Sequence, residues 1–188
     1  EAIGWAESGW PDFTLYAPVF EATEGLPHYG AMLARDVVRR AFAESPEALY
    51  AETRQGDGPM PDFGLAAPLP EDEQAAREAE QMAAHCNALP SEILPGFVAA
   101  QRLRDAALAG EVLRALDDNG GPVVLVTGNG HAQRDWGVPA LLARAAPEVR
   151  VASLGQFEEA LPEEATQYDA TALSPAAPRE DPCLAFRN

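Results

Sequence analysis

The 188-residue sequence contains no lysine, and this absence restricts the partners that it can bind. All 13 basic residues are arginine, and 30 acidic residues bring the formal net charge to −17. Proteins that bind nucleic acids or anionic membrane surfaces rely on clustered positive charge. The composition therefore argues against both kinds of partner.

Long apolar runs and an N-terminal targeting segment are also missing. No stretch reaches the roughly 18 consecutive apolar residues of a membrane-spanning helix. The chain starts at Glu1 with neither an initiator methionine nor a signal peptide. We therefore interpret it as a mature or trimmed fragment whose true start is missing.

Cysteine is scarce, since Cys86 and Cys183 are the only two in the sequence. A pair is the minimum for one disulfide, and the spacing matches no zinc-site pattern. Two unrelated buried thiols are an equally good interpretation. Export to an oxidising compartment would favour the bond.

Apolar residues make up 47% of the sequence, which is enough for the core of one domain. Periodicity predicts helices over 18–24, 35–43, 71–85, 95–118 and 138–146, and strands over 27–33, 123–127, 149–154 and 167–173. Because helices and strands alternate, we expect a single α/β domain over 1–188, with a mostly parallel sheet flanked by helices on both faces. A helical pair is inserted around residues 70–118.

The predicted helix over 95–118 carries polar residues on its apolar stripe. The stripe itself consists of Leu108, Val112 and Leu116. Extended towards the start of the helix, the same stripe reaches Asp105, Arg104 and Gln101. Either an Arg–Asp pair is buried between layers, or this end of the helix faces a polar cavity. Buried charges need partners in both cases.

We predict that the functional centre lies in Val123–Pro139. A buried strand, Val123–Thr127, ends in Gly128-Asn129-Gly130-His131. Ligands bind at the carboxyl ends of parallel strands, and glycines allow the backbone to approach them closely. At such a place His131 could bind a metal, act as an acid or base, or donate a hydrogen bond to a carboxylate. The sequence does not separate these roles.

These residues carry a resemblance to a known family. Thr127-Gly128-Asn129-Gly130-His131, followed by Arg134-Asp135-Trp136-Gly137-Val138-Pro139, resembles the signature of the ChaN family of haem-binding lipoproteins. Supporting segments are Ser8-Gly9-Trp10-Pro11-Asp12 with Tyr16, Gly30 through Arg35, His85-Cys86, Gln101-Arg102-Leu103-Arg104-Asp105-Ala106, and Asp181-Pro182-Cys183. The similarity runs over nearly the whole chain.

The resemblance implies a haem-binding protein of iron acquisition or trafficking rather than an enzyme. It places the protein in the periplasm or lipid-anchored in the cell envelope, with outer-membrane haem-uptake proteins as partners. It also implies a homodimer that holds haem between its subunits, with a tyrosine as the ligand of the haem iron. Of the four tyrosines, Tyr16, Tyr29, Tyr50 and Tyr168, we prefer Tyr16 because it lies in the matching segment. The remaining cofactor-binding residues would be His131, Asn129, Gly130, Arg35 and Arg134.

The sequence departs from the family in two respects, and other interpretations stay open. The family's propionate-binding lysine cannot exist here, and its Gly-Glu-x-His strand end is missing, so we expect the first strand and helix to be absent from this chain. An alternative function is a metal-dependent hydrolase related to the TraB and erythromycin-esterase-like group. In it His131 would hold a metal or activate water, and Arg35 would stabilise an oxyanion. A third interpretation is a structural domain in which His131 only caps a turn.

Overall fold

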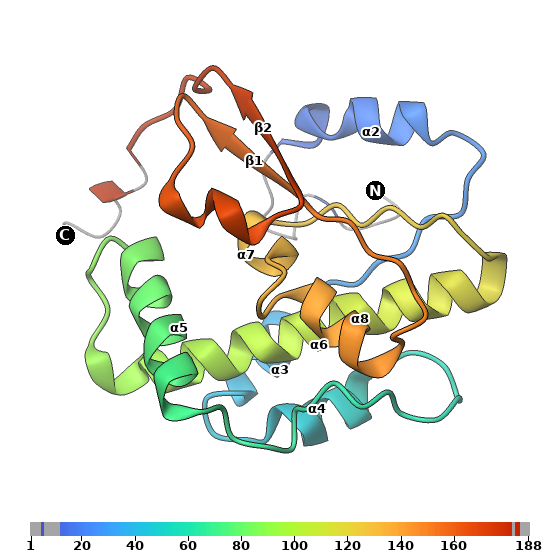
Figure 1. Ribbon diagram of the computed structural model, residues 1–188, viewed down its shortest axis with the longest axis horizontal. Helices are drawn as coiled ribbons and strands as arrows, with labels where there is room; N and C mark the ends of the chain where they lie inside the picture. The colour runs from blue at the N-terminus through green and yellow to red at the C-terminus, as the bar shows by residue number, and fades with distance from the viewer. Residues whose placement is uncertain (1–4, 6–11, 182, 185–188) are drawn as a thin grey trace. The chain divides into compact units, whose positions relative to one another are not determined.

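The computed structural model describes Trp5, residues 12–181 and residues 183–184. The chain divides into two compact units, residues 1–30 and residues 31–188. Figure 1 traces both units, which are described separately below.

The N-terminal unit is organised around aromatic rings. Its first element, η1 (Phe13–Leu15), begins where the carboxylate of Asp12 accepts hydrogen bonds from the backbone N–H and the hydroxyl of Thr14, at 2.8 and 2.6 Å. The following helix α2 (Ala17–Ala22) covers much of the predicted helix over 18–24. The ring centroid of Tyr16 lies 5.0 Å from that of Trp5. Because so short a helix is marginal by itself, we attribute its stability to this ring packing.

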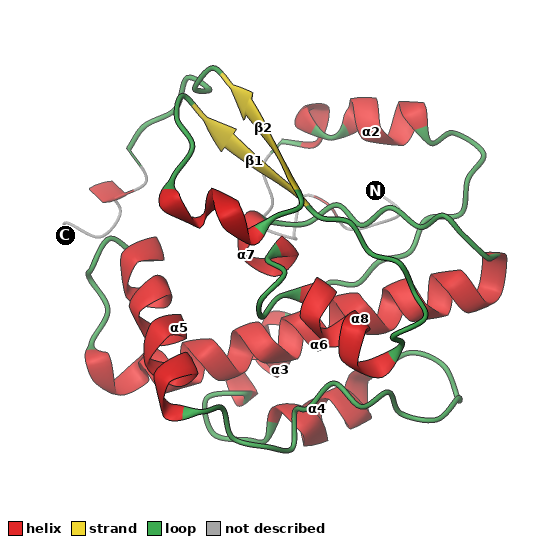
Figure 2. Ribbon diagram, viewed as in Figure 1, coloured by secondary structure: helices red, strands yellow, loops and turns green. Residues whose placement is uncertain are grey.

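Helix α6 (Leu94–Asn119) is the centre of the second unit. Pro95 occupies its first turn, where the missing N–H of proline costs no hydrogen bond, and Gly120 ends it with φ of 71°. The helix contacts α3 (Arg35–Arg40), α4 (Pro46–Thr53), α5 (Glu71–Ala84) and α8 (Val138–Ala145) (Figure 2). Its buried face includes Leu103, which is 0% exposed. Burial of one such leucine contributes about 2 kcal/mol.

The predicted helices over 35–43, 71–85, 95–118 and 138–146 are confirmed as α3, α5, α6 and α8. Helix α4 was not among the predicted helices, because Ser45-Pro46 after the predicted helix over 35–43 can also end a helix. In the structure the hydroxyl of Ser45 accepts from the N–H of Ala48 at 3.5 Å, and Pro46 is the first residue of α4. Both residues therefore start a helix.

The mixed α/β character is confirmed, but the sheet is small. β1 (Leu154–Glu158) and β2 (Ala170–Ser174) pair in parallel, with Leu154 opposite Ala170, and η3 (Glu163–Gln167) lies in their connection. No other paired strand occurs among the described residues. The expectation of a larger parallel sheet flanked by helices on both faces is therefore met only in part.

The segment Val123–Thr127 differs from its prediction as a buried central strand. It is extended but has no paired neighbour within the described part of the chain. Val124 is 83% exposed. The predicted strand over 27–33 is likewise unpaired in that part. An apolar run favours the extended conformation, whereas a strand also needs the backbone groups of a neighbour, which local sequence does not report.

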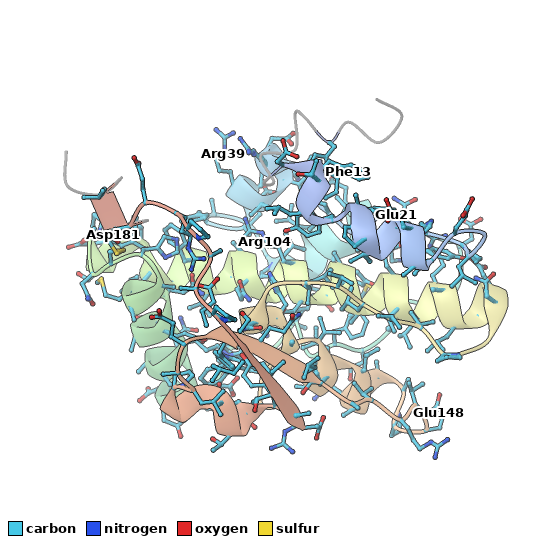
Figure 3. All side chains as sticks on the ribbon, turned by 90° about the horizontal axis from the view of Figure 1, so that it is seen from above. Phe13, Glu21, Arg39, Arg104, Glu148 and Asp181 are labelled. Carbon is cyan, nitrogen blue, oxygen red and sulfur yellow. A yellow bond between two sulfur atoms is a disulfide. The ribbon has the colours of Figure 1, made fainter. Side chains whose placement is uncertain are left out.

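Cys86 and Cys183 form a disulfide across a sequence separation of 97, with their Cα atoms 5.6 Å apart (Figure 3). Cys86 follows the end of α5, and η2 (Ser91–Ile93) then leads into α6. The bond thus fixes the C-terminal segment to the end of α5. Disulfides persist in oxidising compartments, so this bond is consistent with a location outside the cytoplasm.

Candidate functional site

The predicted functional centre contains a short helix, α7 (Asn129–Ala132), where the sequence predicted an open turn. The side chain of Asn129 donates to the carbonyl of Gln156 at 2.6 Å and accepts from its N–H at 3.1 Å. The hydroxyl of Tyr168 donates to the carbonyl of Asn129 at 3.1 Å. These bonds tie α7 to β1, so the small sheet sets the position of His131.

Two side chains of α6 contact one nitrogen of the His131 imidazole. Oδ1 of Asp105 lies 2.6 Å from His131 Nδ1, and the amide nitrogen of Gln101 lies 3.0 Å from the same atom. Gln101 and Asp105 are four residues apart and therefore lie on one face of the helix. Nε2 is then the ring nitrogen that has no hydrogen-bond partner among the described residues.

Asp105 is deeply buried, with its side chain only 1% exposed. This burial raises the pKa of Asp105 to about 6, although the hydrogen bond from His131 acts in the opposite direction. Its Oδ2 has no hydrogen-bond partner within the described structure. An unsatisfied buried acceptor of this kind costs about 1–3 kcal/mol.

The alternative of a buried Arg–Asp pair is resolved by this geometry. Arg104 is exposed on α6 and is labelled in Figure 3. The carboxylate of Asp105 instead pairs with His131, while Gln101 lines a cavity. Of the three polar residues on the stripe, Gln101 therefore lines the cavity, while Asp105 contacts it only through His131.

This cavity beside His131 has a volume of about 340 Å³. Its size suits a small ligand or one end of a larger ligand. The guanidinium of Arg77 lies 5.1 Å from the ring centroid of Trp136 and forms an ion pair with Glu73. The cavity is lined by Arg77, Glu80, Gln81, Ala84, Val98, Gln101, Gly128, Gly130, His131 and Trp136.

The sequence did not assign the α5 residues of this cavity to a site. The acidic first turn and the polar composition of α5 are typical of a solvated helix. Arg77, Glu80, Gln81 and Ala84 recur at spacings of three or four residues, so they share one face. That spacing was the only feature in the sequence that could have grouped these residues. It does not reveal what the face contacts.

The structure separates the other predicted site residues. Gly130 lines the cavity with His131, whereas Arg35 and Arg134 do not. Arg134 donates to Asp169 at 3.2 Å and to the carbonyl of Thr166 at 3.1 Å. Arg35 is exposed at the start of α3. Tyr16 belongs to the N-terminal unit, and residues 8–11 and Pro182 of the resembling segments lie outside the described residues.

Gly137 shows what part of the signature does physically. A Cβ atom at this position would lie 2.5 Å from the carbonyl oxygen of His131 and 2.7 Å from that of Gln133. Only glycine permits so close an approach of two backbone segments. This turn brings Trp136 to the cavity, so the glycine of the motif shapes the wall of the site.

Two further features are absent from the described residues, a helix able to span a membrane and a cluster of metal-binding side chains. None of their helices combines the length and apolar character needed to cross a bilayer. Nor do they contain a group of three or more His, Cys, Asp or Glu side chains placed to hold a metal ion.

Comparisons with known proteins support the resemblance. No curated protein and no solved structure matches the chain significantly. A family model described as haem-binding uptake, Tiki superfamily, ChaN matches residues 1–142 of the 188. The match includes Tyr16, α6, the cavity residues of α5 and the His131 motif. The chain therefore belongs to the ChaN-like haem-binding uptake family of the Tiki superfamily.

Proposed function

We propose that this protein binds haem and takes part in haem or iron acquisition or trafficking in the cell envelope. The observation that carries the proposal is the family match over residues 1–142, which contain both Tyr16 and His131. The disulfide Cys86–Cys183 supports a location in the periplasm, either free or anchored through a lipid. Outer-membrane haem-uptake proteins are the proposed partners.

Tyr16 is the proposed ligand of the haem iron. A phenolate is a hard, anionic ligand, and tyrosine is a known axial ligand of haem. The neighbouring side chains are apolar and exposed, with Leu15 at 69% and Val19 at 41%. Covering them with a flat apolar macrocycle removes this surface from water. The donor and its surroundings therefore fit one face of haem.

His131 is the proposed contact for the haem propionates. Carboxylates accept strong hydrogen bonds from arginine, protonated histidine and backbone N–H groups. Asn129 and Gly130 would supply backbone groups, and Arg35 and Arg134 would supply charge. We propose a homodimer that encloses the haem, with Tyr16 from one subunit and His131 from the other.

Titration of the purified chain with hemin tests this function. We expect the absorbance spectrum of a tyrosine-ligated ferric haem, which Tyr16→Phe abolishes. Tyr29→Phe, in the same N-terminal unit, is the matched control and should keep the spectrum. A wild-type protein that leaves the hemin spectrum unchanged would contradict the proposal. Loss of the spectrum only in the control variant would move the ligand to Tyr29.

A metal-dependent hydrolase of the TraB and erythromycin-esterase-like group is the second candidate. The pairing of His131 with Asp105 supports it, because a carboxylate-bound imidazole is suited to bind a metal or to activate water. Arg35 would stabilise the oxyanion. Metal analysis and a screen of ester and peptide substrates test it. The absence of both bound metal and turnover would contradict the hydrolase function.

A further inference from the structure

We infer that Asp105 is a positioning residue, which holds His131 by Nδ1 and so presents Nε2 to a carboxylate group of a ligand in the cavity shared with Arg77. This inference rests on the proposed haem function, in which the carboxylates are the propionates. It adds Asp105 and Arg77 to the residues that recognise the ligand.

The contacts of the imidazole carry the first step. Nδ1 lies 2.6 Å from a carboxylate oxygen of Asp105, which accepts hydrogen bonds but cannot donate them while ionised. Nδ1 must therefore carry the proton, whether the ring is neutral or protonated. The amide of Gln101, 3.0 Å from the same atom, then turns its oxygen toward Nδ1–H, because two donors cannot share this contact. Since Asp105 is fixed in the middle of the 26-residue helix α6, it also fixes the orientation of the ring.

The charges around the cavity carry the second step. In the protonated ring both nitrogens donate, and Asp105 already occupies Nδ1–H. Nε2–H is then the donor left for a ligand, and the guanidinium of Arg77 lines the same cavity. Glu73 pairs with Arg77, and Glu80 accepts from the amide of Gln133 at 2.6 Å. Glu80 is thus the carboxylate in the cavity lining that would repel an anionic ligand.

A purely structural role for Asp105 predicts something different. If the pair only fastened α7 to α6, its loss would weaken every ligand by the same factor. A positioning role acts only on the part of the ligand that meets Nε2. The protonation of the ring and the dependence on ligand carboxylates therefore separate the two roles.

The first experiment measures the ring directly, without haem. Long-range ¹H–¹⁵N spectra of the full chain report which nitrogen of each histidine is protonated, and His131→Gln identifies the signals of His131 among the three histidines. We expect a protonated Nδ1 in the wild type and a changed proton distribution in Asp105→Asn. An unprotonated Nδ1 in the wild type would overturn the inference. Asp117→Asn, exposed on the same helix, is the control.

The second experiment compares hemin with its dimethyl ester, in which the propionates are uncharged. Asp105→Asn should weaken hemin binding about tenfold, the size expected for the loss of one well-placed hydrogen bond, and should leave binding of the ester unchanged. In the His131→Gln background the same substitution should have no further effect. Glu80→Gln should strengthen hemin binding, because it removes a like charge. Equal losses for hemin and the ester would overturn the inference.

The two experiments fail in different ways. If the wild type binds no hemin, the proposed function is wrong, while the spectra of the ligand-free chain still decide whether Asp105 holds Nδ1. If hemin binds and the affinity of Asp105→Asn matches that of the wild type, the haem function stands and the positioning role is wrong.

Discussion

Asp105→Asn removes a carboxyl group whose pKa burial raises from 3.8 to about 6. The folded protein therefore holds this proton more tightly than the unfolded chain does, and the contribution of Asp105 to the free energy of unfolding falls as pH rises through this interval. At 1.36 kcal/mol per unit of pKa, the total change is about 3 kcal/mol. About 1 kcal/mol of it lies between about pH 5 and about pH 7.5, above the isoelectric point near 4.4.

Urea unfolding followed by circular dichroism measures this effect at the two pH values. The stability of Asp105→Asn relative to the wild type should increase by about 1 kcal/mol from the lower pH to the higher. Asp117→Asn, on the exposed part of α6, should show no such change. A flat difference would refute the raised pKa. A difference of opposite sign would mean that attraction to His131 outweighs the burial of the carboxylate.

Two further predictions concern stability, and both are checked by denaturant unfolding. Gly110→Ala should destabilise the protein by about 1–3 kcal/mol, because its Cβ would lie 2.4 Å from the hydroxyl of the buried Tyr50. Gly58→Ala, with no atom within 4 Å of the new Cβ, should stay close to the wild type, and equal effects would contradict the packing argument. Paired replacement of Cys86 and Cys183 by serine should cost about 2–4 kcal/mol, because the disulfide closes a long loop. An unchanged midpoint in that variant would show that the disulfide contributes nothing to stability.

Long periodic helices were the most predictable part of the fold. The stripe of α6 and the acidic first turn of α5 are local features, and both helices occur within one or two residues of their predicted bounds. Helix α4 was missed because Ser45-Pro46 can end one helix and start another. The sheet was overestimated because Val123–Thr127 has the composition of a central strand but no neighbour among the described residues. Pairing is not encoded within a single segment.

The site could be predicted only around His131, because its sequence neighbours indicate a ligand-facing turn. Two glycines before His131 indicated a ligand-facing turn, and Asp105 was noticeable as a charge on an apolar stripe. Its partner could not be predicted, because His131 follows 26 residues later on a different element. The sequence did not indicate that Arg77 belongs to the site, since an arginine on a polar helix is typical of a solvated surface. Arg77 and His131 line the same cavity only because tertiary contacts bring their helices together.

Asp105 also illustrates why stability alone would not select this side chain. Its burial disfavours the charged form, and one of its oxygens lacks a partner in the described structure, so an uncharged side chain of similar size should fold at least as well at neutral pH. The carboxylate of Asp105 differs from the asparagine amide of Asp105→Asn in one way that matters for His131. The carboxylate can only accept a hydrogen bond from Nδ1–H, whereas the amide can also donate one. A variant that is more stable at neutral pH yet binds hemin less tightly is therefore the combined outcome that the positioning role requires. A loss of stability together with equal losses of affinity for hemin and its dimethyl ester would instead fit a side chain that serves only the packing of α7 on α6.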